Sequence, residues 1–106
     1  MELIVIKQAQ KELRGAPRDV IADVFALFED LMAGKFLSMP ISRPLPSIAK
    51  GLSELRLSGR AGEYRVFYII NAGVAIYVLH GAGKKSQKTA KRTVDLVKAR
   101  IRSLGL

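Results

Sequence analysis

The first third of the chain combines one short apolar run with two stretches of helical spacing. Residues 2–6 (ELIVI) are almost continuously apolar, which predicts a short strand. Residues 7–14 predict a short helix that ends at a glycine. Pro17 and Asp19 then favour a helix start, and Gly34 a helix end. Between them, apolar side chains recur at intervals of three and four residues: Val20, Ile21, Val24, Phe25, Leu27, Phe28, Leu31 and Met32.

The middle of the chain changes from helical spacing to alternation. Residues 35–50 contain three of the four prolines and predict a loop that cannot be a central strand. Residues 54–57 alternate between polar and apolar side chains, and residues 63–70 (EYRVFYII) are rich in β-branched and aromatic ones. A third strand is expected from residue 74 to residue 79 or 80. The tracts SGRAG and NAG between these runs predict turns, so the three strands form a meander.

A final helix is expected after Thr89, which is a plausible N-cap residue. Its apolar stripe is Ala90, Val94, Val97, Ile101 and Leu104. The predicted order is therefore β-α-α-β-β-β-α, an α+β fold with a mainly antiparallel sheet packed by helices. A length of 106 residues fits one domain over residues 1–106.

Composition excludes several classes of protein and site. The chain has no cysteine and one histidine, which excludes disulfides, cysteine-based zinc sites and sites with several histidine ligands. No apolar run approaches the roughly 18 residues that span a bilayer, and the N-terminus lacks the features of a signal peptide. We expect a cytoplasmic protein with no membrane partner, no metal and no cofactor.

The positive charge is confined to the second half of the chain. Residues 1–49 carry six basic and six acidic side chains, whereas residues 50–106 carry twelve basic and three acidic ones, so the whole net charge of +9 lies there. Five of these cations fall in residues 80–92 (HGAGKKSQKTAKR), directly after the last predicted strand and without an acid among them. Such a tract predicts contact with an anionic partner, because a face that only solubilises a protein mixes both signs.

Three basic groups should meet at one end of the meander. Arg56 lies near the end of one strand and Arg65 near the start of the next, where the sheet meets solvent, and Lys84 follows the third strand. Guanidinium and ammonium groups bind phosphate and stabilise the extra charge of a phosphorane transition state. With RNA as substrate the 2′-hydroxyl is the nucleophile, and a lysine crowded by other cations can act as a general base.

Each of these side chains also has a purely structural interpretation. Arg56 and Arg65 can pair with Glu54 and Glu63 on the sheet. His80 continues the face that carries Ile76 and Val78, so it can be a histidine at the core boundary. Tyr64 can pack within the sheet or stack on a base.

The second half of the chain resembles the toxins of the RelE/ParE superfamily, specifically their phage-derived HigB-like branch. The similarity is carried by ELR at residues 54–56, YRVFY at 64–68, LH at 79–80 and KKSQKTAKR at 84–92. It implies a toxin of a type II toxin–antitoxin pair, with a cognate antitoxin that is a small helix-turn-helix protein. Related toxins cut mRNA on the ribosome and leave a cyclic phosphate, so the resemblance implies a ribosome-dependent endoribonuclease.

The resemblance also assigns roles to individual residues. It implies that Arg65 and Lys85 stabilise the phosphate, and that Arg56, Lys84 and Lys88 position the substrate. The candidate catalytic residues are Arg65, Lys85, Lys88 and His80. The candidate RNA-binding residues are Arg56, Arg60, Tyr64, Lys84, Lys91 and Arg92.

Departures from the family pattern leave alternatives open. Branches of the family commonly carry KTQKTP, where this chain has Ser86 and Ala90 in place of the threonine and the proline, and it lacks the tyrosine that some relatives place after the last strand. The general acid and base are therefore open. A ParE-like toxin that inhibits DNA gyrase through a protein contact, and a nucleic-acid-binding module without catalysis, are the alternative functions.

Overall fold

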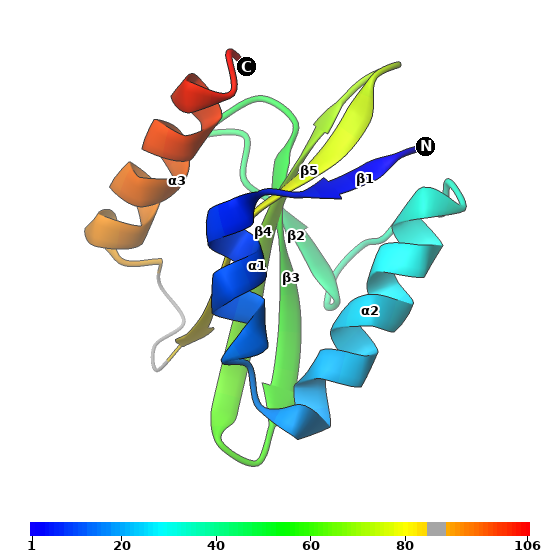
Figure 1. The fold of residues 1–106 in the computed structure, drawn as a ribbon, viewed down its shortest axis with the longest axis vertical. Coiled ribbons are helices and arrows are strands. Elements are labelled where there is room, and N and C mark those ends of the chain that lie inside the picture. Colours follow the sequence, from blue (N-terminus) through cyan, green and yellow to red (C-terminus); the bar gives the residue numbers. More distant parts are fainter. Residues whose placement is uncertain (85–88) are drawn as a thin grey trace.

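A computed structural model describes residues 1–84 and 89–106 of the chain (Figure 1). These residues contain three helices and five strands in nearly the predicted order, and the α+β class is confirmed. In chain order they are β1 (Leu3–Val5), α1 (Lys7–Arg14), α2 (Arg18–Met32), β2 (Ser42–Pro44), β3 (Leu52–Gly59), β4 (Gly62–Asn71), β5 (Ala75–Lys84) and α3 (Lys91–Ser103). None of the helices in these residues is long and apolar enough to cross a membrane.

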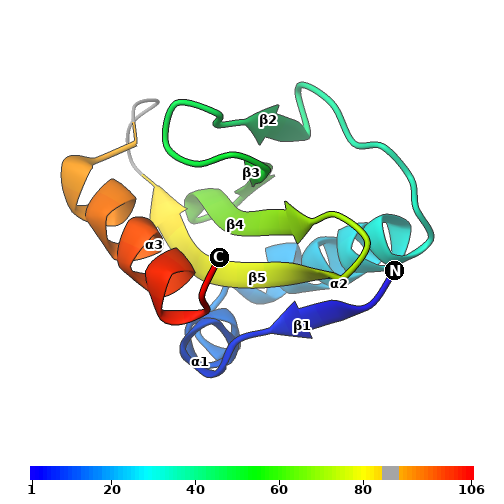
Figure 2. The ribbon, with the colours of Figure 1, turned by 90° about the horizontal axis from the view of Figure 1, so that it is seen from above.

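The strands form one sheet in the order β1-β5-β4-β3-β2 (Figure 2). β1 runs parallel to β5, and the other neighbours are antiparallel, as in the predicted meander. The unpredicted strand is β2, which pairs with β3 at the outer edge through Ser42 and Leu55. The expectation that residues 35–50 form a loop was therefore wrong for Ser42–Pro44, whereas the expectation that they contain no central strand is confirmed, because β2 lies at the edge of the sheet. Pro44 is tolerated because an edge strand has one side without hydrogen-bond partners.

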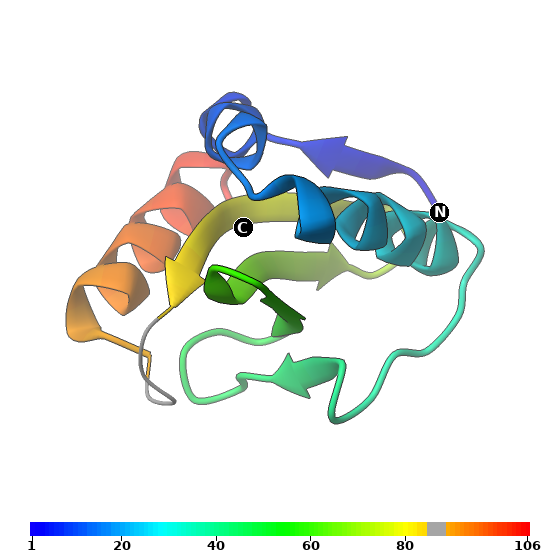
Figure 3. The same cartoon turned by 90° about the horizontal axis from the view of Figure 1, so that it is seen from below.

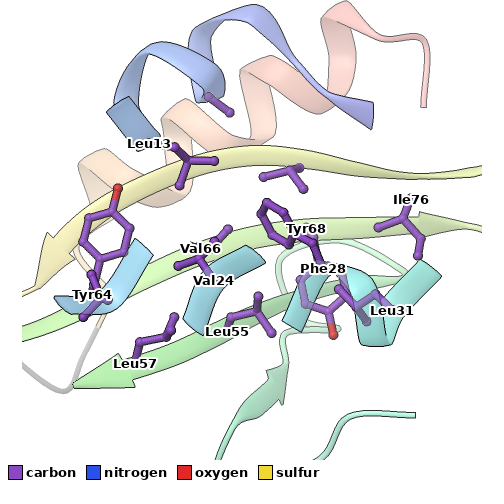
Figure 4. Close-up of a cluster of buried hydrophobic side chains, with 13 residues drawn as sticks. Leu13, Val24, Phe28, Leu31, Leu55, Leu57, Tyr64, Val66, Tyr68 and Ile76 are labelled. Atoms are coloured by element: carbon purple, nitrogen blue, oxygen red, sulfur yellow. The ribbon is translucent and has the colours of Figure 1, made fainter. Parts of the chain in front are cut away.

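Helices cover both faces of the sheet. α1 and α2 lie on one face and α3 on the other (Figures 1 and 3). The larger core packs Val24, Phe28 and Leu31 of α2 against Leu55 and Val66 of the sheet (Figure 4). The smaller core lies under α3 and contains Phe67, Ile69, Leu79, Val97 and Ile101. Both cores follow from the alternation of the strands and the apolar stripes of α2 and α3.

A bulge in β5 changes which face His80 occupies. Phe67 pairs with His80 while Tyr68 pairs with Val78, so Leu79 is the extra residue. A bulge shifts every later side chain to the other face. The expectation that His80 shares the face of Val78 was therefore wrong, and its ring instead stacks on Phe67 with centroids 5.8 Å apart.

Two predicted boundaries differ from the observed ones. β5 continues through the glycines that follow His80 and ends at Lys84. The N-cap of α3 is Ala90 rather than Thr89, and it makes no side-chain capping hydrogen bond. Glycines are poor strand formers, which is why the sequence predicted an earlier end for β5.

Candidate functional site

The face of the sheet that carries α3 changes from apolar to polar along its strands. Three rows of paired residues cross β3, β4 and β5 at this polar end. They are Glu54–Phe67–His80, Arg56–Arg65–Ala82 and Ser58–Glu63–Lys84. We call this surface the polar sheet face. The prediction that Arg56, Arg65 and Lys84 gather at one end of the meander is confirmed at the level of strand register.

Arg65 is buried within this face. Its side chain is 2% exposed, and its Nη2 donates a hydrogen bond to Glu63 Oε2 at 2.5 Å. Its Nε lies 3.9 Å from Oε1 of Glu54, whose side chain is fully buried. The expectation that Arg65 lies where the sheet meets solvent was wrong. The alternative, that Arg65 pairs with the two glutamates, is confirmed.

Glu54 and Arg65 are incompletely satisfied. Both carboxylate oxygens of Glu54 and the Nε of Arg65 are buried without a hydrogen-bond partner within residues 1–84 and 89–106. Each ion loses its hydration, and each depends on the attraction of the other. Glu54 is therefore the counterion that keeps the Arg65 guanidinium in place. Sequence reasoning considered Glu54 only as a surface partner, because its burial depends on the covering segments.

A small pocket opens beside this ion pair. It has a volume of about 260 Å³ and is lined by Pro40, Ile41, Arg56, Ser58, Glu63 and Arg65. Arg56 is half-buried, and its Nη1 lies 3.7 Å from the sulfur of Met39. The pocket thus presents two guanidinium groups and one carboxylate on the polar sheet face.

His80 belongs to a second ion cluster, at the open edge of β5. Its Nδ1 lies 3.0 Å from Glu12 Oε1. Arg100 binds both oxygens of Glu12, at 2.8 and 3.0 Å, and donates to the backbone oxygen of Leu79 at 2.8 Å. Glu12 also accepts a hydrogen bond from the backbone N–H of Gly81 at 3.3 Å. The Glu12–His80–Arg100 cluster therefore joins α1, β5 and α3.

The cluster completes the hydrogen bonding of β5 beyond its pairing with β1. The pairing of β1 with β5 ends near Val78, whose oxygen accepts the Ile6 N–H. The next groups on that edge, the oxygen of Leu79 and the N–H of Gly81, are bound by the side chains of the cluster. Buried backbone groups need such partners. Local sequence patterns do not indicate this arrangement, since Glu12 and Arg100 are 88 residues apart.

The charge state of Glu12 reflects its partners. Burial raises the pKa of its carboxyl, but the hydrogen bonds from Arg100 and His80 outweigh burial, so the pKa lies below its usual value. Glu12 is thus an anion at neutral pH. The Nδ1 of His80 faces both Glu12 Oε1, an acceptor at 3.0 Å, and Arg100 Nη1, a donor at 3.4 Å.

Tyr64 does not lie on the polar sheet face. Its side chain is 4% exposed and packs in the larger core with Leu13 and Val66 (Figure 4). Its hydroxyl lies 3.5 Å from the backbone oxygen of Glu12, and burial raises its pKa. The candidate role of Tyr64 in stacking on a base was therefore wrong, and its packing interpretation is confirmed.

The remaining described candidates lie in the turn between β3 and β4, at the end of β5 and in the first turn of α3. Arg60 is exposed in the turn between β3 and β4, where its backbone N–H donates to Asp19 Oδ2 at 2.7 Å. Lys91 and Arg92 are exposed in the first turn of α3, and Lys91 pairs with Asp95 at 2.9 Å. Lys84 is placed by its register opposite Glu63. Lys85 and Lys88 lie outside the described residues.

The fold is that of the RelE toxins. A chain of the toxin–antitoxin complex RelBE2 from Mycobacterium tuberculosis superposes with a TM-score of 0.56 at 20% identity, covering 80% of this chain and 92% of that one. A mutant of the Escherichia coli toxin RelE in the free state gives a TM-score of 0.55 at 21% identity, covering 94% and 96%.

Residues 11–102 match the model of the family described as phage derived protein Gp49-like. The match spans most of the sequence, and the chain belongs to this family. The resemblance to the phage-derived branch of the RelE/ParE toxins is thereby confirmed. No curated protein sequence matches the chain significantly.

Proposed function

We propose that this protein is the toxin of a type II toxin–antitoxin pair and that it cuts mRNA on the ribosome with its polar sheet face. One observation carries the proposal: Arg56 and Arg65 lie side by side in a pocket at the end of the sheet from which the basic tract begins. The Gp49-like family and the RelE fold support it. Guanidinium pairs of this kind suit phosphate, which each of them can bind through two parallel hydrogen bonds.

Phosphate binding requires a change of partner at Arg65. In this structure the Nη2 of Arg65 is bonded to the carboxylate of Glu63, and the Glu63 side chain is 34% exposed. A phosphate that enters the pocket takes the place of this carboxylate, while the buried Glu54 continues to hold the Nε side of the guanidinium. Lys84 at the end of β5 supplies further positive charge, as do Lys85 and Lys88, which follow it in the sequence. Arg60, Lys91 and Arg92 bind neighbouring phosphates.

The reaction needs no external nucleophile. The 2′-oxygen forms a bond to phosphorus and loses its proton, while the bond from phosphorus to the 5′-oxygen breaks and that oxygen gains a proton. A 2′,3′-cyclic phosphate and a 5′-hydroxyl result. Within residues 1–84 and 89–106, His80 is suited to one of these transfers, since its Nδ1 contacts Glu12 and its Nε2 makes no hydrogen bond there.

A translating extract tests the proposal. The wild type is expected to cut a reporter mRNA and to leave cyclic phosphate ends, which primer extension and end labelling detect. Arg56→Ala is expected to reduce the rate by roughly 10²–10³-fold, the usual effect of losing one charge donor. Arg102→Ala, an exposed change in α3, is the matched control with an unchanged rate.

Two outcomes would contradict the proposal. Intact mRNA together with double-strand breaks in DNA treated with gyrase would assign the ParE-like function instead. RNA binding without any cleavage would reduce the protein to a binding module. Binding itself should weaken by orders of magnitude between about 50 and 200 mM salt, because each phosphate contact releases counterions.

A further inference from the structure

An apolar groove lies between the two N-terminal helices, away from the polar sheet face. α1 and α2 diverge from the turn that joins them, and β1 runs across the end where they are farthest apart (Figure 1). The groove has a volume of about 600 Å³. Leu13 lies on its α1 side, Ile21 and Phe25 on its α2 side, and Val5 at the strand between them. Phe25 is 53% exposed, which is unusual for a phenylalanine that already contacts another ring, that of Phe28.

The rim of this groove is positively charged. Arg14 and Arg18 line it from the two helices, and Lys7 and Lys11 lie on the exposed side of α1. No carboxylate within residues 1–84 and 89–106 forms an ion pair with any of these four cations. By helical spacing, Asp19 and Asp23 of α2 lie on the side away from Arg18 and Phe25. An apolar floor with unpaired cations at its rim is complementary to a segment that is apolar on one side and acidic on the other.

We propose that this groove binds an acidic amphipathic segment of the antitoxin. The inference rests on the proposed function, which requires such a partner. The segment inserts apolar side chains between Leu13 and Phe25, and its carboxylates pair with Arg14 and Arg18. Because α1 and α2 cover the face of the sheet opposite α3, an antitoxin bound here leaves the polar sheet face uncovered. Neutralisation then follows from the bulk of the antitoxin, which keeps the toxin from its RNA on the ribosome.

The test uses the full chain and the product of the neighbouring reading frame that suppresses its growth arrest. Affinity is measured by biolayer interferometry for the wild type and for two groove variants, Phe25→Ser and Arg14→Glu/Arg18→Glu. Each variant is expected to weaken binding by about 30-fold or more, as for the loss of a central interface residue. Both should melt near the wild-type temperature and still arrest growth in the absence of the antitoxin, because the groove is separate from the polar sheet face.

Matched controls change similar side chains elsewhere. Val74→Ser removes an exposed apolar side chain, and Lys98→Glu/Arg102→Glu reverses two exposed charges on α3. Both are expected to bind the antitoxin within about threefold of the wild type. An antitoxin whose acidic residues in the bound segment are replaced by lysines should bind the Arg14→Glu/Arg18→Glu toxin with restored affinity. Only direct pairing of these charges explains such a recovery.

The possible failures are distinguishable. If the antitoxin suppresses growth arrest and both groove variants bind it as the wild type does, the docking site is wrong and the proposed function stands. If the wild type is a dimer that Phe25→Ser converts to a monomer, the groove binds a second copy and the inference is overturned. If the wild type neither arrests growth nor cuts RNA, the proposed function itself fails.

Discussion

Removal of the Arg65 charge should destabilise the whole domain, because it leaves Glu54 as an unpaired buried anion. Glu54 is fully buried, and Arg65 is the only cation within ion-pair distance of it among the described residues. Breaking a buried pair from one side costs about 3–5 kcal/mol. For a domain of this size that corresponds to a decrease in Tm of about 12–40 °C. Since small domains have about 5–15 kcal/mol of stability, Arg65→Met approaches the limit of folding.

A double-mutant cycle measures this coupling. Thermal and urea unfolding, followed by circular dichroism, are compared for the wild type, Arg65→Met, Glu54→Leu and the double variant. The double variant is expected to recover most of the lost stability, because two apolar side chains of similar volume replace both ions. A decrease of less than about 5 °C for Arg65→Met, or a double variant no more stable than the single one, would refute the reasoning. The double variant is also the proper test of catalysis, because it lacks the guanidinium in a folded protein.

Three further predictions concern separate parts of the structure. Glu63→Gln should bind RNA several-fold more tightly in a filter assay, since phosphate then reaches Arg65 without competition; unchanged affinity would show that the pocket is not the binding site. Because the folded pKa of Glu12 is lowered, its contribution to stability is complete above its usual value of 4.5 and is lost as pH falls through the folded pKa. The urea midpoint of Glu12→Gln should therefore depend less on pH in the acid range. Gly51→Ala should lower stability by about 1–3 kcal/mol in thermal unfolding, because φ is 82° and the new Cβ would lie 2.8 Å from the Ile70 oxygen.

The parts of the fold that were predictable are those encoded by local patterns. The stripe of α2, the alternation of β3 and the turns of the meander each depend on neighbouring residues. The position of Arg56 opposite Arg65 on the neighbouring strand was also predictable, because the tight turn between β3 and β4 fixes their register. β2 was not predicted, because a segment of three residues that includes Pro44 has no strand pattern of its own. It forms a strand only because it pairs with the edge of β3.

The parts that were not predictable depend on contacts between distant segments. The bulge at Leu79 reverses the face of His80, and alternation alone cannot reveal an extra residue in a strand. Glu12 and Arg100 meet only because α1 and α3 both pack against the end of β5. The surroundings of Arg65 likewise include the distant Pro40 and Ile41, which line the pocket beside it.

The two glutamates beside Arg65 explain how a site for an anion can exist in a folded protein without its ligand. Arg56 and Arg65 are directly paired across the strands, and without nearby carboxylates their charges would repel each other. Glu54 is fully buried, so it stays with the guanidinium in every state of the folded protein. Glu63 is partly exposed and returns to water at little cost. Under the proposed function, RNA binding is therefore an exchange of one anion for another at Arg65, and its strength depends on how much better a phosphate fits the pocket than the Glu63 carboxylate does.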